Sequence, residues 1–224
     1  MEYTKCFVAF IDILGFKRII DNSSCDEIYK IFSEFKRQFS DIILNGESLV
    51  NAQDVKYKTM SDSIVFYIKD DCKNALFALL ATCASFQANL AKRDIPILSR
   101  GGVFHGDFFI DGDIMFGPAL TKAYLLESQN AKYPRIIMTH SLLQKYGNEM
   151  AQNWVWEESD GFYSVNFSKM IFAQYKTGED NLVRFEKFID SVLDESTDSS
   201  VREKYLYLKN CMLRAFKEVL FDKR

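Results

Sequence analysis

The sequence has few of the residues that form nitrogen or sulfur metal centres. Its 224 residues include two histidines and five cysteines, with no CxxC pair and no Cys/His spacing. This pattern argues against a zinc site. The odd number of unpaired thiols is typical of reduced cytosolic proteins, in which cysteine mostly fills the core.

Long hydrophobic runs and a marked charge imbalance are also absent. No stretch of eighteen apolar residues occurs, so we expect no membrane span, and the first residues lack the pattern of a signal peptide. The net charge is −3 and the lysines are spread among acidic residues, which argues against a nucleic-acid-binding surface. We expect a cytoplasmic protein in which metal ions and a few local cations hold any polyanionic substrate.

Apolar residues are abundant, and the first run of them ends at a carboxylate. Residues 7–11 are Phe-Val-Ala-Phe-Ile, Asp12 follows, and Gly15 leads into a helical pattern. An unbroken apolar run of this length is typical of a strand buried on both faces. Because an unpaired buried charge is costly, Asp12 needs a partner.

Periodicity predicts an α+β fold. We expect strands over residues 7–11, 55–60, 64–68, 97–106, 135–139, 154–156 and 162–165, with a second hairpin turn over 107–113. We expect helices over 15–21, from Ser24 or Asp26 to Asn45-Gly46, over 71–93 and 117–129, after Ser141, and over 180–195 and 198–222.

The order of these elements is β-α-β-β-α-β, followed by a further α-β unit. This is the ferredoxin-like split arrangement, a sheet with helices on one face. We expect a catalytic core over residues 1–148 and a C-terminal extension over 149–224, packed on the same domain. In the extension, Trp154 and Trp156 are expected to share one strand face for packing, and the last helix to pack on its own chain rather than on a dimer partner.

Asp62 falls in the turn of the first hairpin, and in this topology the hairpin neighbours the first strand. Two carboxylates brought together repel unless a cation lies between them. Two hard oxygen ligands suit Mg²⁺ or Mn²⁺, with substrate phosphates completing the coordination. The backbone amides of residues 13–16 are expected to face those phosphates. The alternative is that Asp12 and Asp62 are ordinary cap and turn residues.

Four motifs in the same order resemble those of class III nucleotidyl cyclases, over residues 5–145. Residues 10–16 (Phe-Ile-Asp-Ile-Leu-Gly-Phe) resemble the opening motif, and residues 58–62 resemble the Lys-Thr-Ile-Gly-Asp hairpin, with Ser61 in place of glycine. Residues 100–106 (Arg-Gly-Gly-Val-Phe-His-Gly) resemble the glycine strand. Phe116-Gly117, Ala123 and Glu127-Ser128 resemble the helix that follows it.

The resemblance implies a class III cyclase core and a homodimer whose two active sites lie at the interface, each completed by the other subunit. It implies two Mn²⁺ or Mg²⁺ ions per site. The metal ligands it implies are Asp12, Ile13 and Asp62, of which Asp12 and Asp62 are the catalytic residues. The substrate-binding residues are Leu14, Gly15, Phe16, Tyr57, Lys58, Arg100 and Thr121.

Two departures from the family pattern bear on the substrate. Thr121 and Leu125 stand where the family helix has its asparagine and arginine, and Ile114 stands where it has a purine-binding aspartate, with Asp113 beside it. This combination resembles the pyrimidine cyclases of the bacterial antiphage system called Pycsar. Those enzymes make cyclic UMP or cyclic CMP, which activates a partner effector. The cations that could replace the missing arginine are Lys17, Arg18, Lys122 and Arg135.

The choice of base depends on hydrogen-bond donors. Tyr57, Lys58 and Arg100 are all donors, and uracil offers more acceptors than cytosine, so the sequence favours UTP and leaves CTP as the alternative. Because Tyr57 and Lys58 are adjacent in a strand, only one of them can face the pocket. A further alternative is a non-catalytic nucleotide-sensing domain, which Leu125 favours and the two aspartates oppose. His105 is expected to be structural.

Overall fold

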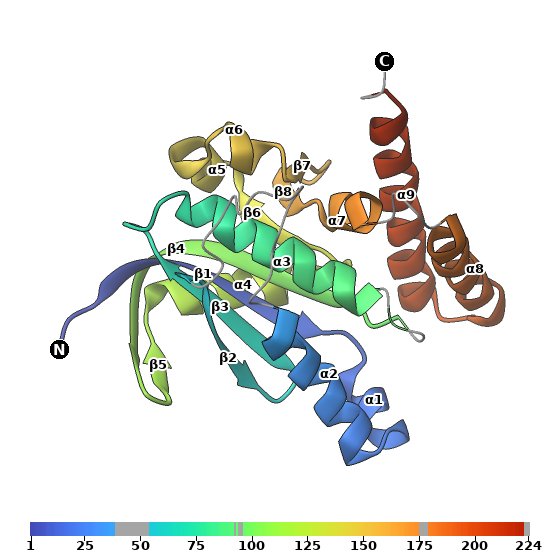
Figure 1. The fold of residues 1–224 in the computed structure, drawn as a ribbon, viewed down its shortest axis with the longest axis horizontal. Helices are drawn as coiled ribbons and strands as arrows, with labels where there is room; N and C mark the ends of the chain where they lie inside the picture. Colours follow the sequence, from blue (N-terminus) through green and yellow to red (C-terminus); the bar gives the residue numbers. More distant parts are fainter. Residues whose placement is uncertain (39–53, 92, 94–95, 175–178, 222–224) are drawn as a thin grey trace.

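The computed structural model describes residues 1–38, 54–91, 93, 96–174 and 179–221. Within these ranges the chain forms an α+β fold around one mixed sheet, as the sequence predicted (Figure 1). The predicted helix end at Asn45-Gly46 lies outside the described residues. None of the described helices is long and apolar enough to cross a membrane.

The sheet has β1 at its centre, bonded to β3 on one side and to β4 on the other. Its order is β2-β3-β1-β4-β6-β8-β7, with β5 paired to β4, and among the strands of the described residues only β4 and β6 pair in parallel. The strands are β1 Thr4–Ile13, β2 Lys56–Met60, β3 Ser63–Lys69, β4 Ser99–Asp111, β5 Ile114–Phe116, β6 Ile136–Thr139, β7 Val155–Glu157 and β8 Phe162–Val165. The order β2-β3-β1-β4 confirms the ferredoxin-like core.

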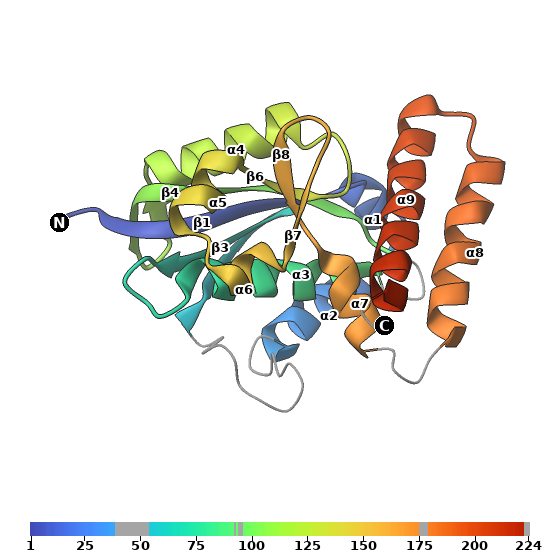
Figure 2. The same ribbon diagram turned by 90° about the horizontal axis from the view of Figure 1, so that it is seen from above.

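Helices cover both faces of the sheet. They are α1 Phe16–Asn22, α2 Cys25–Gln38, α3 Ala75–Ala91, α4 Pro118–Asn130, α5 His140–Tyr146, α6 Glu149–Gln152, α7 Phe167–Gln174, α8 Glu179–Glu195 and α9 Ser199–Phe221. The expectation of helices on one face holds for α2 and α3 but not for the whole sheet, because α4 of the additional α-β unit covers the opposite face (Figure 2).

Successive side chains of β1 point to opposite faces of the sheet and so divide the core in two. Phe7, Ala9 and Ile11 pack toward α3, in a cluster that contains most of its buried side chains, whereas Val8 and Phe10 pack toward α4. Both sets are buried, which confirms the prediction from the unbroken apolar run. Asp12 continues the alternation of Val8 and Phe10 and therefore lies on the α4 face of the sheet.

Two glycines of β4 allow the close packing on which this arrangement depends. A Cβ atom on Gly102 would lie 2.3 Å from the carbonyl oxygen of Ala123, and one on Gly101 would lie 2.6 Å from that of Phe10. The backbone of α4 can therefore approach the sheet only because residue 102 has no side chain. The predicted close approach of another backbone to this glycine strand is confirmed.

The caps of two helices were predicted with different success. Ser24 caps α2 in a reciprocal capping box: its Oγ accepts from the Glu27 amide at 3.3 Å, and Glu27 Oε2 accepts from the Ser24 amide at 2.7 Å. Ser141 does not cap α5. Thr139 does, accepting from the Leu142 amide at 3.3 Å, because it precedes the helix and has the extended backbone of a cap.

The C-terminal part of the chain extends the sheet and adds a helical pair. β8 pairs with β6 of the core and α9 packs against α7 and α8. The prediction that Trp154 and Trp156 share a face is wrong. Trp154 packs against Phe77 of α3 whereas Trp156 lies under Arg214 of α9, because β7 begins only at Val155.

Candidate active site

The backbone brings Asp12 and Asp62 together at one end of the sheet. Asp12 is the last residue but one of β1 and lies opposite Ser63 of β3. The Ile13 amide donates to the Asp62 carbonyl oxygen at 2.9 Å, which holds the β2–β3 turn against the end of β1. The first strand and the hairpin turn are therefore neighbours, as the topology predicted.

The pKa of the Asp12 carboxyl is raised in the folded protein. Burial raises the pKa of its carboxyl, and the charge of Asp62 raises it further. The hydrogen bond and the charge of Arg100 lower it without cancelling the increase. The ionised form of Asp12 is thus disfavoured in the folded protein relative to the unfolded chain.

Arg100 is the cation that Asp12 does have. It lies directly opposite Asp12 on β4, and its Nε donates to Asp12 Oδ2 at 3.3 Å. The same Nε is 2.8 Å from Glu127 Oε1, an ion pair that lacks hydrogen-bond geometry, and Nη1 donates to the Ala131 carbonyl oxygen at 3.4 Å. Arg100 therefore contacts a predicted metal ligand and the C-terminal end of α4 at once.

Glu127 is a site residue that the sequence reasoning did not assign. Its side chain is 4% exposed, and burial raises its pKa; Arg100 lowers it, and Asp12 and Asp62 raise it. The signal was present in the sequence, because Ala119, Ala123 and Glu127 follow one another at four-residue spacing and form the buried face of α4. A carboxylate at such a position needs a partner.

The donors at this end of the sheet fit a hard divalent cation. Asp12 and Asp62 provide carboxylate oxygens, and Ile13, whose carbonyl is the third predicted ligand, follows Asp12 in the chain. Magnesium is commonly held by one or two carboxylates together with substrate phosphates and waters. No group of three or more His, Cys, Asp or Glu side chains in the described part of the chain could hold a metal ion. A metal here would therefore need ligands from its substrate.

The expectation for the backbone amides needs correction. The Ile13 amide is bonded to Asp62 and the Leu14 amide donates to the Leu98 carbonyl oxygen at 2.8 Å, so neither is available to phosphates. Gly15 precedes α1 with φ 73°, a left-handed conformation that favours glycine. Among the predicted phosphate contacts, the amides of Gly15 and Phe16 are those that remain.

The predicted base-binding residues lie on two faces of the sheet. Tyr57 is opposite Phe66 and packs with the α3 core, away from Asp12. Lys58 lies on the α4 face and forms an ion pair with Asp113, 2.9 Å from Nζ to Oδ1. Thr121 is exposed on α4 with its hydroxyl donating to the Gly117 carbonyl oxygen at 3.3 Å. Lys58 and Thr121 thus share the face of Asp12 with Arg100, and Tyr57 does not.

The four cations proposed to replace the helix arginine are in different surroundings. Arg135 is buried and paired with Asp160, so its charge is already neutralised. Lys122 lies on α4 with Nζ 4.9 Å from the centre of the Phe104 ring, and Lys17 and Arg18 are exposed on α1. Arg135 is therefore the weakest of the four candidates.

His105 belongs to a different part of the sheet. It lies opposite Phe7, five residues along β4 from Arg100, or roughly 17 Å at the usual rise of a strand. Its Nε2 is 2.8 Å from Asp70 Oδ2, and its ring packs against Phe7 and Tyr146. This packing is consistent with the structural role expected from the sequence.

The fold is that of known nucleotide cyclases. The structure matches the adenylyl cyclase CyaB from P. aeruginosa with a TM-score of 0.51 and 14% identity, over 73% of this chain and 94% of that one. It matches the catalytic core of a rhodopsin-guanylyl cyclase with converted specificity, in complex with ATPαS, with a TM-score of 0.53 and 16% identity, over 74% and 96%. No protein-family model and no curated protein matches the sequence. The chain therefore has the fold of a class III nucleotidyl cyclase domain.

Proposed function

We propose that this protein is a nucleotidyl cyclase that converts a pyrimidine ribonucleoside triphosphate to its 3′,5′-cyclic monophosphate and pyrophosphate. The observation that carries the proposal is the placement of Asp12, Asp62 and Arg100 together at one end of a class III cyclase sheet. A dead site has no need of two neighbouring carboxylates, which are costly to hold together.

In this proposal Asp12, Asp62 and the Ile13 carbonyl hold two Mn²⁺ or Mg²⁺ ions. When bound, such ions lower the pKa of the ribose 3′-hydroxyl and neutralise the triphosphate. The 3′-oxygen then forms a bond to the α-phosphorus while the bond to the β-phosphate oxygen breaks, and the hydroxyl proton passes to water. In this proposal Arg100 binds the leaving phosphates.

The structure changes the argument about the base. The sequence favoured UTP because Tyr57, Lys58 and Arg100 are donors, but Tyr57 packs on the other face of the sheet, and Lys58 and Arg100 are each paired with a carboxylate. The Asp113 carboxylate beside Lys58 adds an acceptor that suits the amino group of cytosine. UTP and CTP therefore stand as equal candidates, and the proposed pyrimidine preference comes from the resemblance of Thr121, Leu125 and Ile114 to the Pycsar cyclases.

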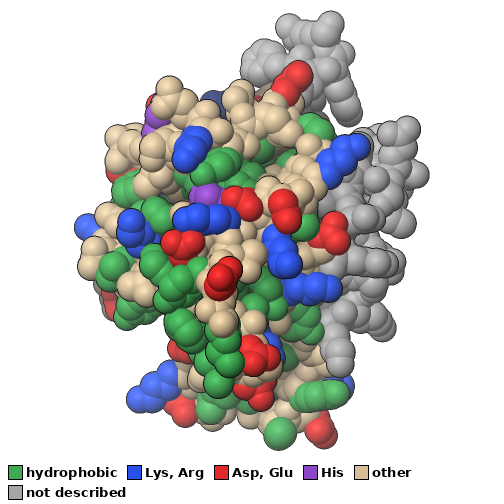
Figure 3. Space-filling view, turned by 90° about the vertical axis from the view of Figure 1, so that its left-hand side faces the viewer, with side chains coloured by type: hydrophobic (Ala, Val, Ile, Leu, Met, Phe, Trp, Pro, Cys, Tyr) green, Lys and Arg blue, Asp and Glu red, His purple; other side chains and the backbone are tan. Residues whose placement is uncertain are grey.

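We also propose a homodimer, in which Lys58 and Thr121 of one subunit complete the site of the other. An apolar surface supports an assembly: Tyr3, Ile114 and Phe116 are exposed near the N-terminus and on the β4–β5 hairpin, where Phe116 stacks on Phe109. Figure 3 shows hydrophobic side chains gathered among charged ones on this side of the molecule. Pairing of two such surfaces would remove apolar area from water.

The biological role that we propose is antiphage signalling, with the cyclic nucleotide activating a downstream effector. This role is supported by the resemblance to the Pycsar cyclases. It predicts that the product, and not the protein, is what the effector binds.

The deciding experiment incubates the purified protein with Mn²⁺ and each of the four ribonucleoside triphosphates, and identifies products by mass. We expect pyrophosphate and a cyclic pyrimidine nucleotide, both lost in Asp62→Ala. Turnover of ATP or GTP alone would keep the cyclase and remove the pyrimidine preference. If none of the four is converted, the non-catalytic nucleotide-sensing alternative is favoured, and binding of the same nucleotides to the protein tests it.

A further inference from the structure

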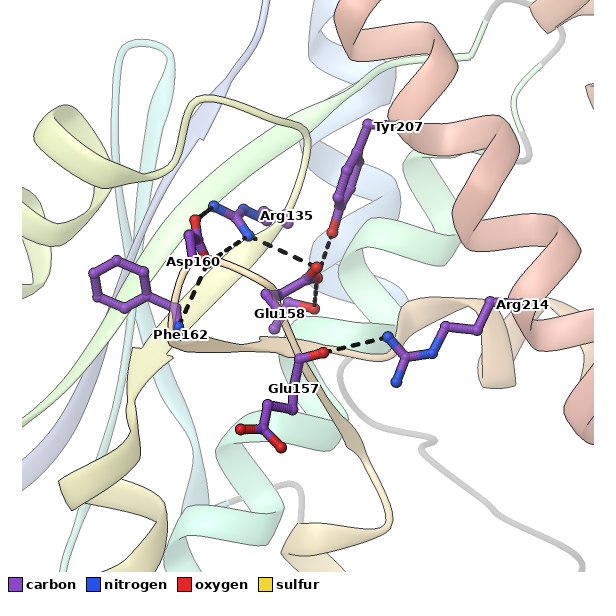
Figure 4. A network of polar contacts seen from close by, with 8 residues as sticks. Arg135, Glu157, Glu158, Asp160, Phe162, Tyr207 and Arg214 are labelled. Atoms are coloured by element: carbon purple, nitrogen blue, oxygen red, sulfur yellow. Dashed lines mark hydrogen bonds and ion pairs between the residues drawn. The ribbon is translucent and has the colours of Figure 1, made fainter.

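A second arginine cluster connects the C-terminal extension to the sheet. Arg135 lies just before β6 with 4% of its side chain exposed, and it pairs with Asp160 and with Glu158 of the β7–β8 turn (Figure 4). Its Nη1 is 3.3 Å from Asp160 Oδ1 and 3.8 Å from Glu158 Oε2. Because a buried guanidinium without carboxylates is costly, these contacts fix the hairpin against the start of β6.

Helix α9 completes this cluster through Tyr207. The Tyr207 hydroxyl donates to Glu158 Oε1 at 2.7 Å, and its ring stacks on Tyr133 with the centres 5.0 Å apart and the planes 7° apart. The Arg135 guanidinium lies beside both rings, 5.5 and 5.8 Å from their centres. Arg214, seven residues further along α9, donates to the Glu157 carbonyl oxygen at 3.4 Å (Figure 4). The helix thus contacts both the hairpin and the segment before β6.

That segment, residues 131–135, also contacts the candidate active site. Its first residue, Ala131, accepts from Arg100 Nη1 at 3.4 Å, and its last residue, Arg135, accepts from the Gly101 amide at 3.0 Å. The five residues therefore hold Arg100 and its neighbour on one side, while Tyr133 and Arg135 are held by α9 on the other. Arrival of a metal at Asp12 would remove one contact of Arg100 and leave those from Glu127 and Ala131.

We infer that α9 is a positioning element for Arg100, acting through Tyr207 and residues 131–135. The inference deepens the proposed function and rests on it in one respect, the role of Arg100 in binding phosphates. Tyr207 touches no reacting atom and is a positioning residue. The C-terminal extension is in this view a point at which a change in α9 docking alters the nucleotide site.

Hydrogen exchange tests the positioning without any need for turnover. We expect Tyr207→Leu, which removes the stacking and the hydroxyl, to speed exchange of the Gly101 amide about tenfold by local opening, with Val8 of the central strand unchanged. Tyr207→Phe keeps the stacking and should give a smaller change of the same pattern, so it carries the test if Tyr207→Leu does not fold. Leu206→Ala, on the exposed side of α9, is the matched control and should change neither amide.

Kinetics then test whether the effect reaches catalysis through Arg100. Tyr207→Leu should lower kcat/KM for the pyrimidine triphosphate about tenfold in the wild-type background and less than twofold in an Arg100→Ala background, because residues that act through one another are not additive. Unchanged exchange at Gly101, or an equal loss in both backgrounds, overturns the inference. Absence of all turnover in the wild type removes the proposed function instead, and the exchange result still decides the positioning.

Discussion

In each of two clusters in this molecule one arginine lies among carboxylates, and the clusters differ in how far the arginine compensates the negative charge. Around Arg100 there are three acidic side chains, Asp12, Asp62 and Glu127, and the arginine is 29% exposed. Around Arg135 there are two, Asp160 and Glu158, and the arginine is 4% exposed. The first cluster is open and short of positive charge, whereas the second is buried and also receives the Tyr207 hydroxyl.

The pKa shifts follow this difference. In the Arg100 cluster burial raises the pKa of Asp12 and of Glu127, and the single arginine does not compensate for it. Burial acts in the same direction on Asp160, but the hydrogen bond and charge of Arg135 outweigh it and the pKa of Asp160 falls. A cluster of the first kind is suited to bind a cation, and one of the second kind holds two parts of a fold together.

The largest expected effect is on activity, in Asp12→Asn. The change removes a metal ligand and should lower turnover by roughly 10³-fold, because the two-metal reaction depends on both carboxylates. It should not lower the free energy of unfolding at pH 7, since a carboxyl whose pKa is raised in the folded state opposes folding when ionised. Pyrophosphate release and chemical denaturation measure the two quantities.

The outcome that contradicts this view of the Arg100 cluster is a marked loss of stability in Asp12→Asn. It would mean that the Asp12–Arg100 pair holds the fold together, like the second cluster. The wild-type protein measured in the same buffer with a chelator is the reference.

Arg135→Met should show the reverse pattern. Removing the buried guanidinium leaves Glu158 and Asp160 without their cation and should lower the free energy of unfolding by about 3 kcal/mol, the lower end of what breaking a buried pair costs, because Asp160 is partly exposed. Lys209→Met is the matched control: it breaks the 2.6 Å ion pair with Asp190 at the surface, where solvent screens the charges, and should cost much less than Arg135→Met. Equal losses in the two variants would remove the distinction between buried and exposed pairs.

Metal addition should separate the clusters directly. Mn²⁺ at a hundred times its dissociation constant should raise the free energy of unfolding by about 2.7 kcal/mol, and a chelator should reverse the gain. Asp12→Asn should lose this response, while Arg135→Met should keep it despite its lower starting stability. Thermal unfolding with and without Mn²⁺ gives the comparison, and a response in Asp12→Asn equal to that of the wild type would place the metal elsewhere.

The sequence predicted the core because its signals are local. The alternating burial of β1, the hairpin around Asp62 and the glycines of β4 all follow from strand periodicity and from the need for close packing. Asp12 was recognised because a carboxylate that ends an apolar run needs a partner. The turn between β2 and β3 then predicted that Asp62 is its neighbour.

What the sequence did not predict depends on contacts between distant segments. Glu127 was read only as part of a motif, and its contact with Arg100 needed the packing of α4 on Gly102. The Arg135 cluster joins residues 135, 158, 160 and 207, which no periodicity relates. The prediction that the Ile13 and Leu14 amides face phosphates was wrong for the same reason. Their hydrogen-bond partners, Asp62 and Leu98, lie on distant segments of the sequence.

The smallest expected effect is in Asp160→Asn, and its pH dependence gives the sharpest contrast with Asp12. The pKa of Asp160 is lowered in the folded protein, so its ionised form contributes stability at pH above its unfolded pKa of about 3.9. That contribution is lost as the pH falls through the lower folded value. At pH 7 Asp160→Asn should therefore be less stable than the wild type by under about 1 kcal/mol, a modest value because the side chain is 43% exposed. The asparagine oxygen can still accept from the Phe162 amide, as Asp160 Oδ1 does at 3.4 Å, so the turn itself should persist (Figure 4).

Thermal unfolding of Asp160→Asn and of the wild type at pH 7, 5 and 3 should show the difference in stability shrinking only at the lowest pH. Because Asp12→Asn is not expected to lower stability at pH 7, only Asp160→Asn of the two should be destabilising, and an equal loss in both would mean that the two arginines neutralise their carboxylates equally.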